Sequence, residues 1–494
     1  MAPRAVVIGS GFGGLAAAVR LGARGYDVTV CERLDAPGGR AYVYQQDGFT
    51  FDAGPTIITA PFLLEELWGL CGRRLQDDVE LRSLSPFYQL RFPDGSSFDC
   101  HGDAQRMRAQ VEQLAPGDAR GFDKFMRLSE TIYRIGFESL GHVPFESWWD
   151  MVRIAPDLLR VSGHRSVYAL VAGLVKDSRL RTLLSFHPLL VGGNPFTTTS
   201  VYALIVHLER RFGVHFAMGG TGTIVKGLMK LLHTQGARVR FNSEVRSIEL
   251  EGRRAVGVRL ADGELVPAEV VVSDADAAWT YLNLLPPGTC RRWSPRRFGR
   301  AQYSMGLFVW YFGTHGTYPD VAHHTILFGR RYRELLADIF QRRILPEDFS
   351  LYLHRPTATD PSLAPPGCDT FYVLSPVANL QGNIDWRVAA EPYRQAIQKH
   401  LQSTLLPGLG ERIRTSRVTT PLDFRSRLLA VHGTGFGLQP LLRQSAWFRP
   451  HNRSEEIEGL YLVGAGTHPG AGVPGVLSSA RVLDRVVPDA RAVH

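Results

Sequence analysis

A glycine-rich turn close to the N-terminus constrains the fold of this 494-residue chain more than any other feature. Residues 5–8 are apolar and lead directly into Gly9-x-Gly11-x-x-Gly14, and a helix-like segment follows up to Gly25. In a strand–turn–helix unit, the first glycine permits the turn, the second lets the backbone approach a pyrophosphate, and the third lets helix and strand pack closely. The helix N-terminus then presents free N–H groups and the positive end of its dipole to the phosphates. The sequence therefore predicts a dinucleotide-binding unit.

A second predicted strand and a later turn extend this unit. Residues 28–30 form the strand, and Glu32 ends it about 20 residues after the glycines, where a carboxylate can accept hydrogen bonds from ribose hydroxyls. These features suit NAD and FAD equally. Gly39 and Arg40 suit a second approach to the pyrophosphate, with the guanidinium countering its charge, and this favours FAD.

The C-terminal region supplies the second half of a flavin site. Residues 460–463 are typical of a short apolar strand, and a helix is predicted to begin near residue 473. Its N–H groups and dipole would stabilise the negative charge that a reduced flavin carries near N1 and O2, and a proline in its first turn loses no hydrogen bond. The expected cofactor contacts here are Gly464, Ala465, Pro474, Gly475 and Val476, and the rigid turn Gly54-Pro55-Thr56 is expected to lie under the flavin ring. The predicted cofactor is FAD.

The segments between these halves suggest the remaining organisation. A helix over 224–234 and strands over 237–241 and 270–272 return the chain to the dinucleotide sheet, and Val245, which begins a hairpin, is a further expected cofactor contact. The predicted fold class is α/β, with a Rossmann-like, glutathione-reductase-like FAD-binding domain, a mixed-sheet substrate domain and a helical membrane-facing insert. We expect the FAD-binding domain in residues 1–75, 215–290 and 441–494, the substrate domain in 76–104 and 291–440, and the helical insert in 105–214.

Composition narrows the class of protein. The chain is 44% hydrophobic and 21% charged, which supports a large core, and it carries a formal net charge of +9. We find no Lys/Arg block with interleaved aromatic residues, so nucleic acid is not an expected partner. Five cysteines without paired spacing predict neither a metal site nor a disulfide framework and favour a reducing compartment. The first strand begins within a few residues of the N-terminus, and no apolar run approaches the roughly 18 residues of a membrane span, so we expect neither a signal peptide nor a spanning helix.

At this level of detail the chain resembles the bacterial and fungal type of phytoene desaturase, within the flavin amine-oxidase-like superfamily. Blocks that the whole superfamily shares lie at residues 9–15, 37–42 and 49–56. Narrower blocks lie at residues 189–195, 322–325, 444–452 and 460–475. The resemblance extends through essentially the whole chain.

The resemblance implies repeated removal of two hydrogens from a long, colourless polyene, in carotenoid biosynthesis. Because a carotene has no acid, base or charged group, the flavin must carry out the oxidation while the protein supplies position and electrostatics. We expect hydride transfer from an allylic C–H to flavin N5, followed by proton loss from the neighbouring carbon. Alternatives on the same scaffold are a carotenoid isomerase or saturase, a desaturase of another carotenoid, a flavin amine oxidase, and a carrier that shields prenyl groups without redox chemistry.

Candidate catalytic side chains are few. Asp150 and Arg153 lie three residues apart and would share one helix face, so the carboxylate could receive the proton while the guanidinium holds its charge. A surface ion pair on a helix explains the same spacing. His323 and His324 lack an evident third metal ligand, which favours structural or substrate-channel roles.

The implied substrate sets the expected location. A carotene is dissolved in the bilayer, so an enzyme without a spanning helix must reach it from the membrane surface. Residues 144–161, which include Trp148 and Trp149, and residues 165–184 are the candidate membrane-facing segments. We therefore expect a cytoplasmic, peripherally membrane-associated protein, a quinone or oxygen as electron acceptor, and room for a homo-oligomer on the membrane.

Overall fold

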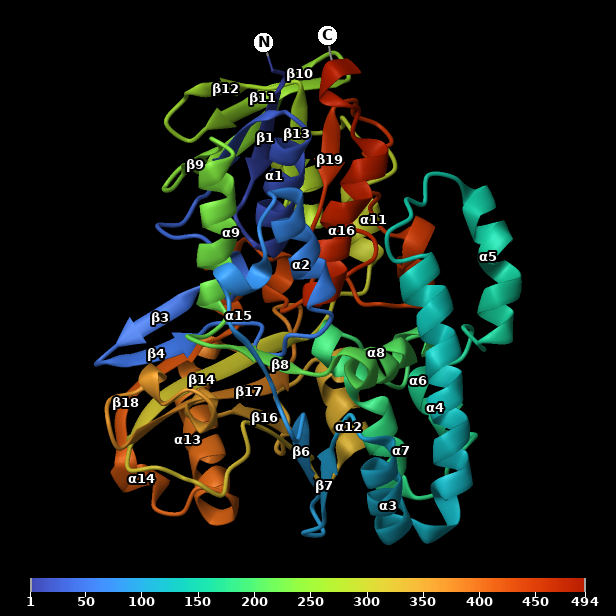
Figure 1. The fold of residues 1–494 in the computed structure, drawn as a ribbon, viewed down its shortest axis with the longest axis vertical. Helices are drawn as coiled ribbons and strands as arrows, with labels where there is room; N and C mark the ends of the chain where they lie inside the picture. Colours follow the sequence, from blue (N-terminus) through green and yellow to red (C-terminus); the bar gives the residue numbers. More distant parts are fainter. Residues whose placement is uncertain (1, 493–494) are drawn as a thin grey trace.

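The computed structural model describes residues 2–492. At one end, which carries both termini, lies a five-stranded parallel sheet in the order β19-β13-β1-β2-β9 (Figure 1). Its strands are β1 (Arg4–Ile8), β2 (Asp27–Cys31), β9 (Arg238–Arg240), β13 (Val270–Ser273) and β19 (Leu460–Leu462). The predicted strands near residues 5, 28, 238, 270 and 460 are thus confirmed, and they join into one sheet although they are far apart in the sequence.

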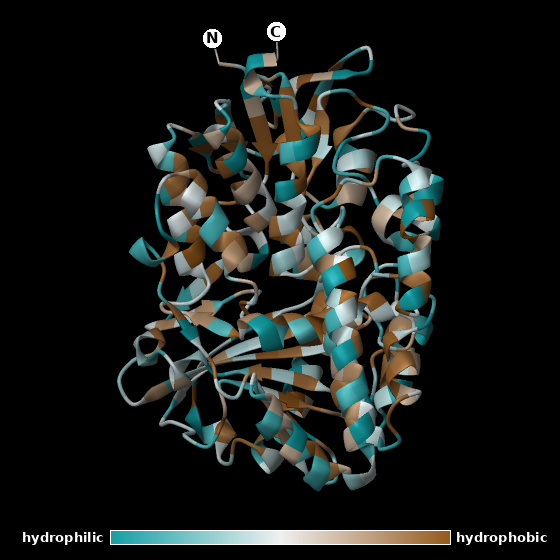
Figure 2. Cartoon of the chain, turned by 45° about the vertical axis from the view of Figure 1, so that its right-hand side comes forward, coloured by the Kyte–Doolittle hydropathy of each residue, from teal (hydrophilic) through white to brown (hydrophobic). Residues whose placement is uncertain are grey.

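Both faces of this sheet are covered, which explains why its strands are apolar at successive positions. Ala5 and Val7 face a core formed with helices α1 (Phe12–Ala23), α2 (Phe62–Leu70), α9 (Gly222–Thr234) and α16 (Val473–Val486). Val6 and Ile8 face a three-stranded antiparallel sheet of β10 (Val245–Glu251), β11 (Arg254–Leu260) and β12 (Leu265–Pro267). Figure 2 shows the strands at this end as a largely hydrophobic block.

A seven-stranded mixed sheet forms the second layer, in the order β18-β14-β17-β16-β15-β6-β7. Its strands are β6 (Tyr88–Arg91), β7 (Ser97–Cys100), β14 (Gly306–His315), β15 (His324–Leu327), β16 (Leu351–His354), β17 (Cys368–Val377) and β18 (Ile413–Thr419). β15 pairs in parallel with β6, and the other neighbouring strands pair antiparallel.

Strand alternation gives this sheet two apolar faces. Phe308, Trp310 and Phe312 of β14 pack with α13 (Trp386–Thr404) on one side. Leu307 and Tyr311 point the opposite way and line a cavity between this sheet and the nucleotide-side sheet. The large apolar residues of β14 therefore pack into a core on one face of the sheet and line the cavity on the other.

Residues 104–212 form a predominantly helical unit beside both sheets (Figure 1), as the sequence predicts. Its helices are α3 (Ala104–Leu114), α4 (Ala119–Tyr133), α5 (Trp148–Arg160), α6 (Val167–Ala172), α7 (Ser178–Ser185) and α8 (Leu204–Phe212). Helix α5 lies at the outer edge and contains no buried residue. Among residues 2–492, no helix combines the length and the apolarity needed to cross a bilayer.

Shorter elements complete the description. The two-stranded sheets are β3 (Val43–Gln46) with β4 (Phe49–Asp52), and β5 (Leu81–Ser83) with β8 (His215–Ala217). The short helices are α10 (Ala277–Trp279), α11 (Pro295–Arg300), α12 (Tyr332–Ala337), α14 (Leu409–Arg412) and α15 (Pro421–Leu428).

Candidate active site

A single continuous cavity of ≈ 560 Å³ extends from the glycine turn after β1 to the cavity-facing side of the mixed sheet. Fourteen of the fifteen residues expected from the sequence to contact the cofactor line it: Gly9, Gly11, Glu32, Gly39, Arg40, Gly54, Pro55, Thr56, Val245, Gly464, Ala465, Pro474, Gly475 and Val476. The fifteenth, Gly14, packs against the turn instead, because a Cβ there would overlap the Gly9 carbonyl oxygen. This is the packing role that the third glycine was expected to have.

The predicted loops meet in space at backbone contact distance. A Cβ at Gly39 would lie 3.2 Å from the Gly11 Cα, and a Cβ at Gly54 would overlap the Arg40 carbonyl oxygen. A Cβ at Gly13 would lie 2.9 Å from the backbone nitrogen of Gly464, so the N-terminal and C-terminal halves also meet. The glycines therefore leave a cradle that side chains would fill.

Charged groups in this cradle fit a diphosphate. Arg40 lines the cavity, and its buried Nε has no hydrogen-bond partner among the described residues. This is expected of a guanidinium that binds an anion. The Asp274 carboxylate lies against the same glycines, with Oδ2 2.5 Å from where a Gly11 Cβ would be. Burial raises the pKa of Asp274 to about 7, so its protonated form can lie beside phosphate oxygens without repelling them. The sequence reasoning missed Asp274, although it follows β13 at the carboxyl edge of a parallel sheet, where ligands bind.

Glu32 has a defined orientation. Its Oε2 accepts hydrogen bonds from the backbone nitrogen (2.8 Å) and hydroxyl (2.6 Å) of Ser10, and its Oε1 accepts one from the backbone nitrogen of Leu34 (2.8 Å). The carboxylate lines the cavity at the end of β2. Its expected contact with ribose hydroxyls stays a prediction.

Residues 53–56 are held by the N-cap residue of α9 and by one residue each from β14 and β16. Thr221 Oγ1 donates to the Pro55 carbonyl oxygen (2.6 Å), and Tyr311 of β14 donates its hydroxyl hydrogen to the Ala53 carbonyl oxygen (3.0 Å). The hydroxyls of Thr56 and Tyr352 are 2.6 Å apart. Thr56 therefore lies where the nucleotide-side cradle meets the mixed sheet.

The loop between β19 and α16 is supported from behind by residues 444–452, one of the narrow sequence blocks. The fully buried Arg449 guanidinium donates to the carbonyl oxygens of Ala465 (2.7 Å), Gln444 (3.1 Å) and Leu438 (3.2 Å). Asn452 Nδ2 donates to the His468 carbonyl oxygen (2.9 Å). These bonds position a loop that must approach the flavin, so residues 444–452 act as its support.

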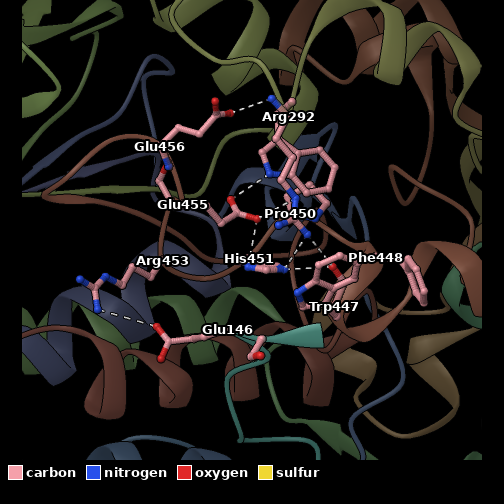
Figure 3. Close-up of polar contacts among 12 residues, drawn as sticks. Glu146, Arg292, Trp447, Phe448, Pro450, His451, Arg453, Glu455 and Glu456 are labelled. Carbon is pink, nitrogen blue, oxygen red and sulfur yellow. Dashed lines mark hydrogen bonds and ion pairs between the residues drawn. The ribbon is translucent and has the colours of Figure 1, made fainter. Parts of the chain in front are cut away.

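A polar cluster attaches this support to the rest of the protein (Figure 3). Glu455 Oε1 lies 3.0 Å from His451 Nδ1 and 3.2 Å from Arg292 Nε, and His451 Nε2 lies 3.0 Å from the Trp447 carbonyl oxygen. The Arg292 guanidinium stacks 4.3 Å from the centre of the Trp447 ring. In the same view, Arg453 reaches Glu146 at 3.8 Å, just before α5.

The rest of the cavity is lined mainly by apolar and aromatic side chains. Tyr372 and Leu374 of β17 form its floor, and Phe186 and Leu189 form a side wall. Met151, Ile154 and Leu158, one face of α5, close it on the outside. An apolar chamber that opens onto a flavin cradle suits a long hydrocarbon whose oxidation depends on the cofactor.

Comparison with known proteins agrees with this geometry. The family model described as flavin containing amine oxidoreductase matches residues 12–482. The phytoene desaturase (neurosporene-forming) of Cereibacter sphaeroides is 51% identical over 99% of this chain and 95% of its own length. The chain belongs to the phytoene desaturase family. The family membership that the sequence resemblance implied is thus confirmed, and FAD is the cofactor.

Two further comparisons define the breadth of this similarity. The phytoene desaturase (lycopene-forming) of Pantoea ananas is 48% identical over 96% of this chain and 97% of its own length. A solved structure of putrescine oxidase bound to putrescine shares the fold, with a TM-score of 0.66 at 15% identity, over 99% of this chain and all of that one.

Asp150 and Arg153, the catalytic pair expected from the sequence, do not line the cavity of this desaturase. Asp150 is the third residue of α5, where its carboxylate accepts a hydrogen bond from the Ser147 backbone nitrogen (3.0 Å) as half of a capping box. Arg153 is exposed. The structure places neither residue among those that line the cavity, and their catalytic role stays a prediction.

His323 and His324 have a third partner that the sequence reasoning missed. His354 of β16 brings its Nε2 to 3.1 Å from that of His323, and one nitrogen from each of the three rings lies close enough for the group to hold a metal ion. Burial lowers the pKa of His323 to about 3. His354 comes from the strand that pairs with β15, a relation that sequence spacing does not reveal.

Proposed function

We propose that this protein desaturates phytoene to more conjugated carotenes of the neurosporene or lycopene type, with FAD as oxidant. The observation that carries the proposal is the 51% identity, over 99% of the chain, to a relative named phytoene desaturase (neurosporene-forming). The continuous cavity, with a diphosphate cradle at one end and hydrocarbon walls at the other, supports it.

FAD, when bound, supplies a hydride acceptor. The residues of the chain provide position and electrostatics around it. The N-terminus of α16, with Pro474 in its first turn, lines the cavity and offers backbone N–H groups to negative charge on the ring. Leu307, Leu374 and Phe186 surround the polyene with apolar surface, which excludes water from a cationic intermediate.

We further propose that α5 docks on the bilayer and admits the substrate. Its inner face lines the cavity, whereas Trp148, Trp149 and Leu159 are among the exposed large hydrophobic residues of the molecule. Amphipathic aromatic rings favour the membrane interface. The second candidate segment is less suitable, because Leu180, Leu183 and Leu184 of α7 are buried.

The remaining expectations complete the proposal. The electron acceptor is a quinone or oxygen, the protein is cytoplasmic and peripheral to the membrane, and on the membrane it can assemble as a homo-oligomer. The proposed domains are residues 1–75, 215–290 and 441–494 for FAD, 76–104 and 291–440 for the substrate, and 105–214 for the helical unit.

The test is a pigment assay. The chain is expressed in a bacterium that carries genes for phytoene synthesis, and the extract is separated and its absorption spectra recorded. We expect yellow to red products, whose absorption maxima count the desaturation steps. A colourless extract from cells that contain FAD-loaded protein would contradict the proposal and favour another carotenoid substrate, an isomerase or a saturase; protein without flavin would favour a carrier.

A further inference from the structure

A buried carboxylate on the hydrocarbon side of the cavity has no role in the mechanism so far. Glu209 belongs to α8, whose residues Leu204, Ile205 and Leu208 line the cavity with it. Only 5% of Glu209 is exposed. Placing a carboxylate among apolar side chains costs free energy unless its oxygens are hydrogen-bonded, so its presence on this wall calls for a reason.

Each oxygen of Glu209 has a polar partner. The Tyr88 hydroxyl donates to Oε1 at 2.7 Å, and His187 Nε2 lies 3.3 Å from Oε2. Burial, and then the Glu209 charge, raise the pKa of Tyr88 well above its ordinary value, so Tyr88 keeps its proton and remains a donor. One partner comes from β6, 121 residues before Glu209, and the other from residues 187–191, and together they hold the carboxylate in one orientation.

The other carboxylates that line the cavity, among the residues described, have different tasks. Asp423 accepts hydrogen bonds from the backbone and hydroxyl of Thr420 at the start of α15, and Asp276 caps α10. Glu244 pairs with Arg33 at the cavity edge. Glu32 and Asp274 lie in the nucleotide cradle, which leaves Glu209 as the carboxylate of the hydrocarbon chamber.

Glu209 also lies near the flavin end of that chamber. Its partner His187 begins a 3-10 helix that ends at Val191, a span of about 8 Å at the usual rise of such helices. A Cβ at Gly472, the N-cap of α16, would lie 3.1 Å from Val191 Cγ1. One short helix therefore connects the carboxylate site to the helix N-terminus that faces the flavin.

We propose that Glu209 is the proton acceptor of the desaturation and stabilises the positive charge that precedes proton loss. This inference rests on the proposed function. A hydride, with both electrons of an allylic C–H bond, passes to FAD. The C–H bond on the neighbouring carbon then breaks, its proton bonds to a Glu209 oxygen, and its electron pair forms the new double bond. The acid returns its proton to water before the next step, and a quinone or oxygen reoxidises the flavin.

The test compares Glu209→Gln, which keeps the shape and removes the charge, with Glu209→Asp, which keeps the charge. Phytoene in liposomes is mixed anaerobically with FAD-loaded protein, and flavin reduction is followed by its absorbance. We expect Glu209→Gln to reduce its flavin about 100-fold more slowly, because the carboxylate stabilises the positive charge that develops as the hydride leaves, and electrostatic stabilisation of this kind contributes about that factor. Glu209→Asp should recover part of the rate. Equal FAD content and thermal midpoint in all three proteins separate this effect from misfolding.

A binding measurement tests the charge without turnover. A long-chain alkyl trimethylammonium ion imitates a cationic hydrocarbon, and the alcohol of equal chain length serves as its neutral match. We expect the wild-type protein to prefer the ammonium about tenfold over the alcohol, measured by quenching of tryptophan fluorescence, and Glu209→Gln to lose this preference.

The outcomes are distinct. Wild-type flavin reduction rates in FAD-loaded Glu209→Gln, or an unchanged preference for the ammonium ion, would overturn the proposal. A third outcome is that the wild-type protein makes no pigment from phytoene while the Glu209→Gln variant lacks the wild-type preference for the ammonium ion. In that case the cation site stands and the proposed substrate is wrong. If Glu209→Gln does not fold, Tyr88→Phe, which removes one donor and keeps the carboxylate, should shift the ammonium preference, and no shift would again overturn it.

Discussion

The two ends of the cavity are built in different ways. At the nucleotide end, closely approaching backbone forms much of the wall: Gly39 approaches Gly11, Gly54 approaches Arg40, and Gly13 approaches Gly464, all at distances that a side chain would prevent. At the hydrocarbon end, the walls are side chains from strands and helices far apart in the sequence, such as Tyr372 and Phe186.

This difference implies different tolerance to change. A backbone cradle fails when any side chain enters it, because the backbone cannot move aside within a packed fold. A side-chain wall can adapt by repacking, so substitutions there should alter rate or product more than cofactor binding. The predictions below test this contrast, beginning with the largest expected effect.

Gly14→Ala should abolish FAD binding and destabilise the protein by about 3 kcal/mol, at the upper end for an overpacked site, because the added Cβ overlaps the Gly9 carbonyl oxygen. Flavin absorbance of the purified protein and its denaturation midpoint measure both effects. Gly69→Ala in α2 is the matched control, since a Cβ there meets no atom within 4 Å. A flavin-loaded, stable Gly14→Ala protein would refute the backbone account.

Arg449→Lys should lower FAD occupancy and cost about 2 kcal/mol, because an ammonium cannot reach the three carbonyl oxygens that the guanidinium bridges. The measurements are bound flavin per protein and urea denaturation. Arg330→Lys, at an exposed position, is the control. Normal FAD content in Arg449→Lys would mean that the flavin loop keeps its conformation without this support.

Asp274 should make FAD affinity depend on pH. The pKa of Asp274 is raised to about 7, and bound diphosphate favours its protonated form, so affinity should hold below pH 7 and fall up to tenfold per unit above it. Fluorescence titration of apoprotein with FAD at pH 6, 7, 8 and 9 measures this. Asp274→Asn should keep high affinity throughout, and identical pH profiles would contradict the assignment.

Replacing Trp148 and Trp149 with Ala should weaken binding to anionic liposomes about tenfold, because two exposed rings, 52% and 58% accessible, would no longer enter the interface. Co-sedimentation at low salt measures the effect. Val388→Ala on α13, which removes an exposed apolar side chain elsewhere, should change nothing. Absence of liposome binding by the wild-type protein would refute membrane docking through α5.

Asp150→Asn should cost about 1 kcal/mol of stability, as the loss of half a capping box at α5. It should change the rate of flavin reduction only a few-fold. A loss of 100-fold or more in the same assay would instead support the proton-accepting role expected from the sequence and count against Glu209.

Backbone-determined features could be predicted from the sequence because they repeat a local pattern. Gly9, Gly11 and Gly464 lie in short motifs whose local backbone conformation is set by nearby residues, so the turns themselves could be predicted. Their approach to one another joins distant segments, as where Gly13 meets Gly464. Val245, which begins β10, was expected to contact the cofactor and lines the cavity; the contact itself stays a prediction.

Side-chain contacts between distant segments could not be predicted in this way. Glu209 meets Tyr88 across 121 residues, and His354 meets His323 only because their strands pair. Asp150 has the same spacing to Arg153 whether it caps a helix or receives a proton. Pairing of strands and packing of helices decide these cases, and neither leaves a periodic signal in one sequence.

The position of β19 and α16 has a consequence for the synthesis of the protein. β19 and α16, the helix that completes the flavin cradle, come from residues 460–486 and are therefore made after the other four strands of the nucleotide-side sheet. Arg20 of α1 pairs with Asp484 of α16, 464 residues further along the chain, so α1 acquires this partner long after it has itself been made. FAD should therefore bind only once residues 460–486 have been made, and a chain that stops before residue 460 should remain colourless however well the rest folds.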